Sequence, residues 1–234
     1  MKNEILGVEI ITEDVRAVAQ IETVVFKLLF GFASLSEVNF NDTIALHNSR
    51  CKQIAEVLLE NLNYSDLCAD DKLFFQSNRK VKYYLAISCA LHDLGKTTVP
   101  QNILLKPSSL TEAELKVMKS HTTKPELEYF ASAGLDGNIF VNIMRECIRS
   151  HHENYNGEGG YPDNLCGTDI PFAGRLMKVI DVLDNLVTDA VYRKALQFEE
   201  AYQEMLKLNG IMFDPVIIDS LMASKEQVRQ IVSK

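Results

Sequence analysis

The stretch Leu91-His92-Asp93-Leu94-Gly95-Lys96 is the part of the sequence on which the predicted fold and site depend. It follows a nearly continuous apolar run over residues 81–91, which is typical of a buried central helix. An adjacent His-Asp pair supplies an imidazole nitrogen and a carboxylate that is able to bridge two cations. Such a pair also occurs by chance at helix ends, so its meaning depends on the rest of the chain.

Histidine is scarce in the chain, and its positions extend the His-Asp pair into a candidate metal site. The five histidines are His47, His92, His121, His151 and His152. Successive residues on a helix project about 100° apart, so His151 and His152 are expected to serve two neighbouring ions rather than to chelate one. A single site could use all five imidazoles.

Composition places the chain among globular proteins and excludes several functional classes. Its 234 residues suit one compact domain with an extension. A net charge of −8 argues against binding to a nucleic acid polymer. Five widely spaced cysteines suggest no disulfide framework. No signal core and no apolar run of about 18 residues is found, so we expect no membrane span and a cytoplasmic location.

The spacing of apolar residues predicts an all-α fold. Thr111 with Glu114 forms a capping box before one helix, and Ser224 with Gln227 is expected to cap another. Gly95 is expected to end the central helix. Residues 63–78 and the glycine-rich stretch 153–169 are expected to be loops. The predicted helices cover about 14–34, 42–62, 81–91, 111–121, 137–152, 171–189, 197–208, 215–222 and 225–233.

Asp181 lies in the middle of one predicted helix, between apolar neighbours. A buried carboxylate is costly unless it is paired or bound to a metal. Two interpretations stay open on this ground alone: a metal ligand, or a core carboxylate paired with an N–H group or an arginine.

The order of these motifs resembles that of the HD-GYP proteins of the HD superfamily, over about residues 40–222. All five histidines fall on positions that hold metal in that family. The resemblance includes several short motifs in the same order along the chain: His92-Asp93-Leu94-Gly95-Lys96, Pro100-Gln101-Asn102-Ile103-Leu104, His151-His152-Glu153, Gly160-Tyr161-Pro162, Ile170-Pro171 and Phe213-Asp214-Pro215.

The resemblance implies an HD-superfamily helical bundle at residues 41–234 with a short extension at 1–40. It also implies a phosphodiesterase that hydrolyses cyclic di-GMP or a related cyclic dinucleotide with two divalent transition-metal ions, iron or manganese. Asp93 and Lys96 are expected to be catalytic, and Lys96, Tyr161 and Arg193 to contact the substrate. The implied metal ligands are His47, His92, Asp93, His121, His151, His152 and Asp181.

Three departures from the family pattern leave alternatives open. Ala190 stands where the family commonly has an arginine that helps to hold the substrate phosphate, and the loop before Tyr161 has an extra residue. Thr43 stands where some members have a glutamate that adds a third ion, so we expect two ions here. A degenerate member that binds metal or nucleotide and acts by protein contact is therefore the second hypothesis. A homo-oligomer or a signalling-protein partner is also considered, and we expect any regulatory signal to come through the N-terminal helix or a partner.

Overall fold

The computed structural model describes residues 43–131, 134–189 and 194–233, and within these ranges the fold is all-α, as predicted. The only β-type pairing among them is an isolated bridge between Asn209 and Phe213. None of the described helices is both long and apolar enough to cross a bilayer. The predicted helix at about 14–34 and the extension at 1–40 lie outside the described residues.

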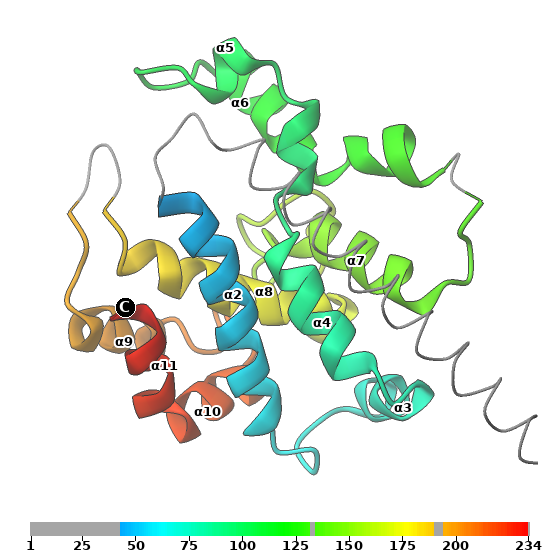
Figure 1. Ribbon diagram of the computed structural model, residues 1–234, viewed down its shortest axis with the longest axis vertical. Helices are drawn as coiled ribbons and strands as arrows, with labels where there is room; N and C mark the ends of the chain where they lie inside the picture. The colour runs from blue at the N-terminus through cyan, green and yellow to red at the C-terminus, as the bar shows by residue number, and fades with distance from the viewer. Residues whose placement is uncertain (1–42, 132–133, 190–193, 234) are drawn as a thin grey trace, which may run out of the picture.

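Four helices form the centre of the molecule: α2 (Thr43–Glu60), α4 (Val81–Ala90), α7 (Ile139–Ser150) and α8 (Phe172–Leu186). α2 packs against α4 and α8, and α7 packs against α4 and α8, so each central helix contacts at least two others (Figure 1). Their shared core contains fully buried side chains such as Ile54, Leu85, Met177 and Ile180. Each such side chain contributes about 1.5–3 kcal/mol through burial.

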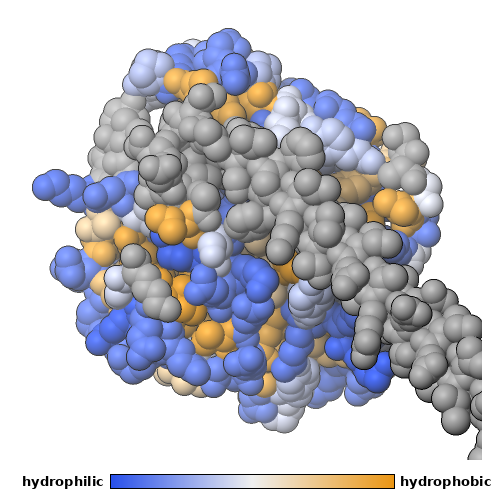
Figure 2. Space-filling view, viewed as in Figure 1, coloured by the Kyte–Doolittle hydropathy of each residue, from blue (hydrophilic) through white to orange (hydrophobic). Residues whose placement is uncertain are grey.

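The remaining helices surround this centre. α9 (Phe198–Lys207), α10 (Pro215–Ala223) and α11 (Lys225–Val232) lie together beside α2 and α8, whereas α5 (Gln101–Leu104) and α6 (Glu112–Lys119) project from one end (Figure 1). On the face drawn in Figure 2, hydrophilic residues separate several smaller hydrophobic patches. α6 therefore lies outside the main core.

Two of the predicted helix caps have different outcomes. Thr111 and Glu114 form the expected capping box at the start of α6. The prediction that Ser224 caps α11 was wrong. The Ser224 hydroxyl donates to the Ser220 carbonyl one turn earlier and makes no capping hydrogen bond to α11. A serine hydroxyl that bonds back along the chain is not available as an N-cap acceptor.

The prediction of a loop over 63–78 was wrong for its second half. Residues Ala69–Ser77 form α3, where the Cys68 sulfur accepts from the Asp71 N–H group at the N-cap. Phe75 anchors this short helix, because its ring lies 4.9 Å from that of Phe172. Polar residues at the ends of the segment concealed a helix that depends on a tertiary aromatic contact.

The prediction that Gly95 ends the central helix was also wrong. α4 ends at Ala90, and Gly95 lies inside a 3₁₀ helix, Leu94–Thr98. A Cβ atom at Gly95 would lie 1.9 Å from the His121 carbonyl oxygen. This glycine is therefore required for close contact between the Leu94–Thr98 turn and the Ser120–Thr122 turn that carries His121.

Candidate metal centre

Five separate segments bring the predicted ligands together at one end of the central helices. α2 carries His47, the turn after α4 carries His92 and Asp93, and α8 carries Asp181. His121 lies in the 3₁₀ turn after α6. His151 and His152 follow the last residue of α7. The seven predicted ligands thus form a single constellation from segments that are up to 134 residues apart in sequence, from position 47 to position 181.

The candidate ligands form three overlapping groups, and within each group the ligand atoms all lie within 4.8 Å of one another. One group contains His121, His151 and His152. Another contains His92, Asp93 and His151, and the third contains His47, Cys51 and His92. Donor atoms bound to one ion at about 2.0–2.2 Å lie at most roughly 4.4 Å apart. The 4.8 Å limit is close to that spacing, so each group is a candidate to surround one ion.

The Asp93 carboxylate lies between two halves of the constellation. One half contains His47, His92 and Asp181, and the other contains His121, His151 and His152. Its Oδ2 atom is 3.1 Å from His92 Nε2. Its Oδ1 atom is 3.5 Å from His121 Nε2 and 3.8 Å from His151 Nε2. One carboxylate oxygen therefore faces each half, which is the arrangement that a bridging ligand requires.

Asp181 completes the half that contains His47. Its Oδ1 atom is 3.9 Å from His47 Nε2 and 3.8 Å from His92 Nε2. The same oxygen accepts a hydrogen bond from Asn185 one turn further along α8. Neither an arginine nor a backbone N–H group is among the contacts of this carboxylate in the described part of the chain, so the geometry favours a metal ligand.

Backbone carbonyls hold three of the histidines in a common orientation. The Nδ1 atoms lie within hydrogen-bond distance of the carbonyls of Cys89 for His92, Met118 for His121 and Ile148 for His151, at 2.9, 2.7 and 2.9 Å. In the neutral ring, donation from Nδ1 to these carbonyls leaves each Nε2 atom as an acceptor aimed at the centre. The helix ends thereby fix the tautomer that a metal needs.

His47 is oriented by a carboxylate, Asp184, which the sequence did not indicate. His47 Nδ1 is 2.7 Å from Asp184 Oδ2, and Arg50 donates to both Asp184 oxygens at 2.5 and 2.8 Å. Asp184 is fully buried. Carboxylates in this position fix ligand histidines and increase their basicity. The available signal was spacing: Arg50 follows His47 by three residues, and Asp184 follows Asp181 by three.

Charge at the centre differs between its two halves. Burial disfavours the charged form of His47, but nearby Cys51 and the hydrogen-bonded Asp184 carboxylate raise its pKa to about 10. Burial likewise disfavours the charged form of His92, but the neighbouring Asp93 carboxylate raises the pKa of His92 to about 9. Burial and the neighbouring His121 lower the pKa of His152 to about 2. The metal-free centre is therefore protonated on one side and neutral on the other.

Two unsatisfied atoms test whether these residues suit a metal. His92 Nε2 and Asp93 Oδ1 are buried and have no hydrogen-bond partner of acceptable geometry among the described residues. A buried polar atom without a partner costs about 1–3 kcal/mol. Imidazole and carboxylate donors suit iron, manganese, zinc or nickel better than magnesium or calcium. The donor set fits divalent transition-metal ions.

Tyr161 and Lys96 lie at the edge of the centre. The Tyr161 ring stacks on that of His152, with centroids 4.5 Å apart and planes 21° from parallel. Lys96 donates to Asp93 Oδ2 at 2.5 Å. Glu153 holds the loop that carries Tyr161, because it accepts from the N–H groups of Asp163 and Asn164. Arg193, the third expected substrate contact, lies outside the described residues, as does Ala190.

The all-α bundle that gathers histidines and aspartates at one end agrees with the helical bundle that the resemblance to the HD superfamily implied. The HD domain family matches residues 40–217. The chain belongs to the HD domain family, and its motifs and relatives are those of the HD-GYP type.

Curated relatives agree with this classification. A probable cyclic di-GMP phosphodiesterase of Vibrio cholerae is 32% identical over 95% of this chain and 49% of the relative. The cyclic di-GMP phosphodiesterase response regulator RpfG of Xanthomonas campestris is 37% identical over 63% of this chain and 38% of the relative. A 3'3'-cGAMP-specific phosphodiesterase of Vibrio cholerae is 32% identical over 56% of this chain and 24% of the relative. The chain thus spans about half or less of the length of these relatives.

Proposed function

We propose that the chain is a metal-dependent phosphodiesterase that hydrolyses cyclic di-GMP or a related cyclic dinucleotide. The observation that carries the proposal is the Asp93 carboxylate, which faces a histidine group on each side and has a buried oxygen without a hydrogen-bond partner. The names of the relatives supply the substrate class.

The proposed site holds two divalent ions, with iron or manganese as the favoured metals. His47, His92 and Asp181 surround the first position, and His121, His151 and His152 surround the second, with Asp93 shared. When bound, two such ions would lower the pKa of a water molecule and neutralise charge on a phosphoryl group. Asp93 holds the two positions together, and Asp184 and the helix-end carbonyls keep the imidazoles pointed inward.

Two other residues are proposed to handle the substrate. Lys96 brings a positive charge to the Asp93 carboxylate and is only partly exposed, so its ammonium is positioned to donate hydrogen bonds to a phosphate oxygen at the same place. Tyr161 covers His152 and offers an aromatic edge to the substrate. Arg193 is retained as a further substrate contact on the resemblance alone.

A protein that binds metal or nucleotide without hydrolysis is the second candidate. Two sequence features favour it: Ala190 stands where the family commonly has a phosphate-binding arginine, and the loop before Tyr161 has an extra residue. The complete set of candidate ligands favours the enzyme.

The decisive assay uses purified protein loaded with Mn²⁺, or with Fe²⁺ under anaerobic conditions. It is incubated with cyclic di-GMP and with 3'3'-cGAMP, and linear products are separated by chromatography. We expect hydrolysis that the chelator EDTA abolishes. Binding of metal without hydrolysis of either nucleotide would favour the second candidate.

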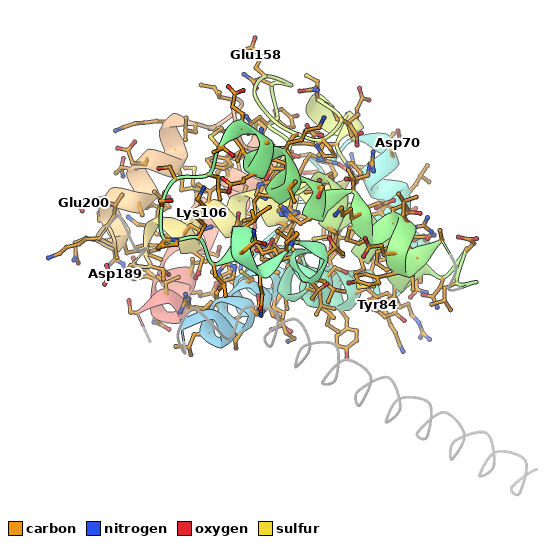
Figure 3. All side chains as sticks on the ribbon, turned by 90° about the horizontal axis from the view of Figure 1, so that it is seen from above. Asp70, Tyr84, Lys106, Glu158, Asp189 and Glu200 are labelled. Atoms are coloured by element: carbon orange, nitrogen blue, oxygen red, sulfur yellow. The ribbon has the colours of Figure 1, made fainter. Side chains whose placement is uncertain are left out.

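A matched pair of variants separates the site from general damage. Asp93→Ala is expected to remove hydrolysis, whereas Asp70→Ala is expected to retain it. Asp70 is an exposed carboxylate in the first turn of α3, at the edge of the molecule in Figure 3. Full activity in Asp93→Ala would disprove the proposed centre.

A further inference from the structure

Tyr161 has a second neighbour besides His152. The ammonium of Lys119 lies over the Tyr161 ring, 4.7 Å from its centroid. Lys119 is the last residue of α6 and precedes His121 by two positions. Since Tyr161 also lies against His121, with ring centroids 6.5 Å apart, the lysine is held at the rim of the metal centre.

Within the described part of the chain, no Asp or Glu oxygen lies at ion-pair distance from the Lys119 ammonium. Lys96, by contrast, lies 2.5 Å from Asp93. An aromatic face attracts a cation without neutralising it, so Tyr161 orients Lys119 and leaves the full charge available to an anion.

A cyclic dinucleotide carries two phosphodiester groups in one ring, and only one is cleaved at a time. The cleaved group must reach the Asp93 end of the site, beside Lys96. The other group is then held outside the centre. The molecule as a whole carries a net charge of −8, so a dianionic ligand needs cations placed locally.

We propose that Lys119 binds the phosphate that is not cleaved, and that Tyr161 positions it for that contact. The inference rests on the proposed function and adds a substrate-binding residue to it. Lys96 and Lys119 then divide the two phosphates between them, one at the Asp93 carboxylate and one at the rim.

A purely structural role for Lys119 predicts something different. Lysine in the last turn of a helix interacts favourably with the helix dipole, and its stem covers the tyrosine ring. Loss of those contacts changes stability, but it gives no reason for an effect that depends on the number of phosphates in the substrate.

The test compares Lys119→Met with Lys119→Arg on metal-loaded protein. The matched control is Lys116→Met, an exposed lysine one turn earlier on α6. Each is assayed with cyclic di-GMP and with bis(p-nitrophenyl) phosphate, a diester that has a single phosphate.

For Lys119→Met we expect KM for cyclic di-GMP to rise about 10-fold with kcat nearly unchanged, as for loss of a charge-assisted contact made equally before and during reaction. KM for bis(p-nitrophenyl) phosphate should not change. Lys119→Arg should restore most of the affinity, and Lys116→Met should match the parent. The KM of Lys119→Met should also depend less on salt.

Three outcomes would overturn the inference. An unchanged KM for cyclic di-GMP in Lys119→Met would show that Lys119 does not bind the substrate. An equal rise in KM for both substrates would place Lys119 at the cleaved phosphate instead. If the parent protein hydrolyses the single-phosphate diester but no cyclic dinucleotide, the proposed function itself fails, and the inference fails with it.

Discussion

Asp184 is the residue on which the orientation of His47 depends. It is fully buried and accepts hydrogen bonds from His47 and Arg50, and it is not itself one of the candidate metal ligands. Burial alone would raise its pKa, but the hydrogen bonds from Arg50 and His47 lower it below its usual value. Asp184 therefore stays ionised and holds the His47 ring in place.

We expect Asp184→Asn to weaken metal binding about 10–100-fold, the usual effect of losing a carboxylate partner of a ligand histidine. The neutral amide no longer stabilises the Nδ1–H tautomer of His47. Competition with a fluorescent chelator measures the affinity. Asp136→Asn, at an exposed carboxylate, serves as the control. Unchanged affinity in Asp184→Asn would show that this carboxylate has no part in the centre.

The unequal protonation of the centre leads to a pH prediction. The raised pKa values of His47 and His92, about 10 and about 9, mean that both rings are in the doubly protonated, positively charged form at pH 7.5. His121, His151 and His152 have lowered pKa values and are already neutral. Metal binding should therefore release about two protons, since only deprotonated imidazoles bind metal.

Isothermal titration calorimetry in buffers of different ionisation enthalpy measures that release. Apparent affinity should rise with pH until about pH 9–10 and then level off. Without metal the sign is opposite: the raised pKa values of His47 and His92 stabilise the fold fully below about pH 6.5, and this contribution is lost as pH rises through 9–10. Metal binding at pH 7.5 without proton release would contradict these charge states.

At the residue scale, the candidate ligands could be predicted from the sequence, but the residues that orient those ligands could not. The order of the five histidines is visible in the chain, and the structure brings all five together. Spacing of three residues places Arg50 beside His47 and Asp184 beside Asp181, but the contact between Arg50 and Asp184 spans more than 130 residues and could not be predicted from that spacing alone. Lys119 was missed for the same reason, because its partner Tyr161 lies on a different segment.

Among the structural elements, the 3₁₀ turn at Leu94–Thr98 shows why element boundaries were harder to predict than their existence. Apolar spacing predicts the helix over 81–91 correctly, but its end depends on how the next turn packs. Gly95 is placed there because the His121 carbonyl approaches it closely, a tertiary contact without a local signal. α3 was missed because its stabilising partner, Phe172, is about 100 residues away.

We expect Gly95→Ala to separate the two turns that carry Asp93 and His121. The added methyl group would meet the His121 backbone, which cannot move away as a flexible side chain can. Overpacking of this kind costs about 1–3 kcal/mol of folding stability. Thermal unfolding and metal titration should both show a loss. A variant with the stability and metal affinity of the parent would show that the close approach is not required.

On the scale of the whole molecule, a buried ion network joins distant helices. Arg175 on α8 donates to Asp71 on α3 at 2.7 Å and also pairs with Asp214, the N-cap residue of α10. All three are buried. The network joins α3 and the start of α10 to α8, the helix that carries Asp181.

We expect Arg175→Met to lower the free energy of unfolding by about 3–5 kcal/mol, because two buried carboxylates lose their only charged partner in the described structure. Urea denaturation measures this value. The control Arg79→Met removes an exposed arginine and should change stability little. Similar stability of the two variants would contradict a structural role for the network.

The central claim is a two-ion centre held together by Asp93, and a crystal of the metal-loaded protein tests it most directly. Anomalous scattering at the metal edge, with elemental analysis, gives both the number and the positions of the ions. We expect two ions per chain, one beside His47 and His92 and one beside His121, His151 and His152, and their loss in Asp93→Ala. A single ion, a third ion beside Thr43, or two ions retained in Asp93→Ala would contradict the account.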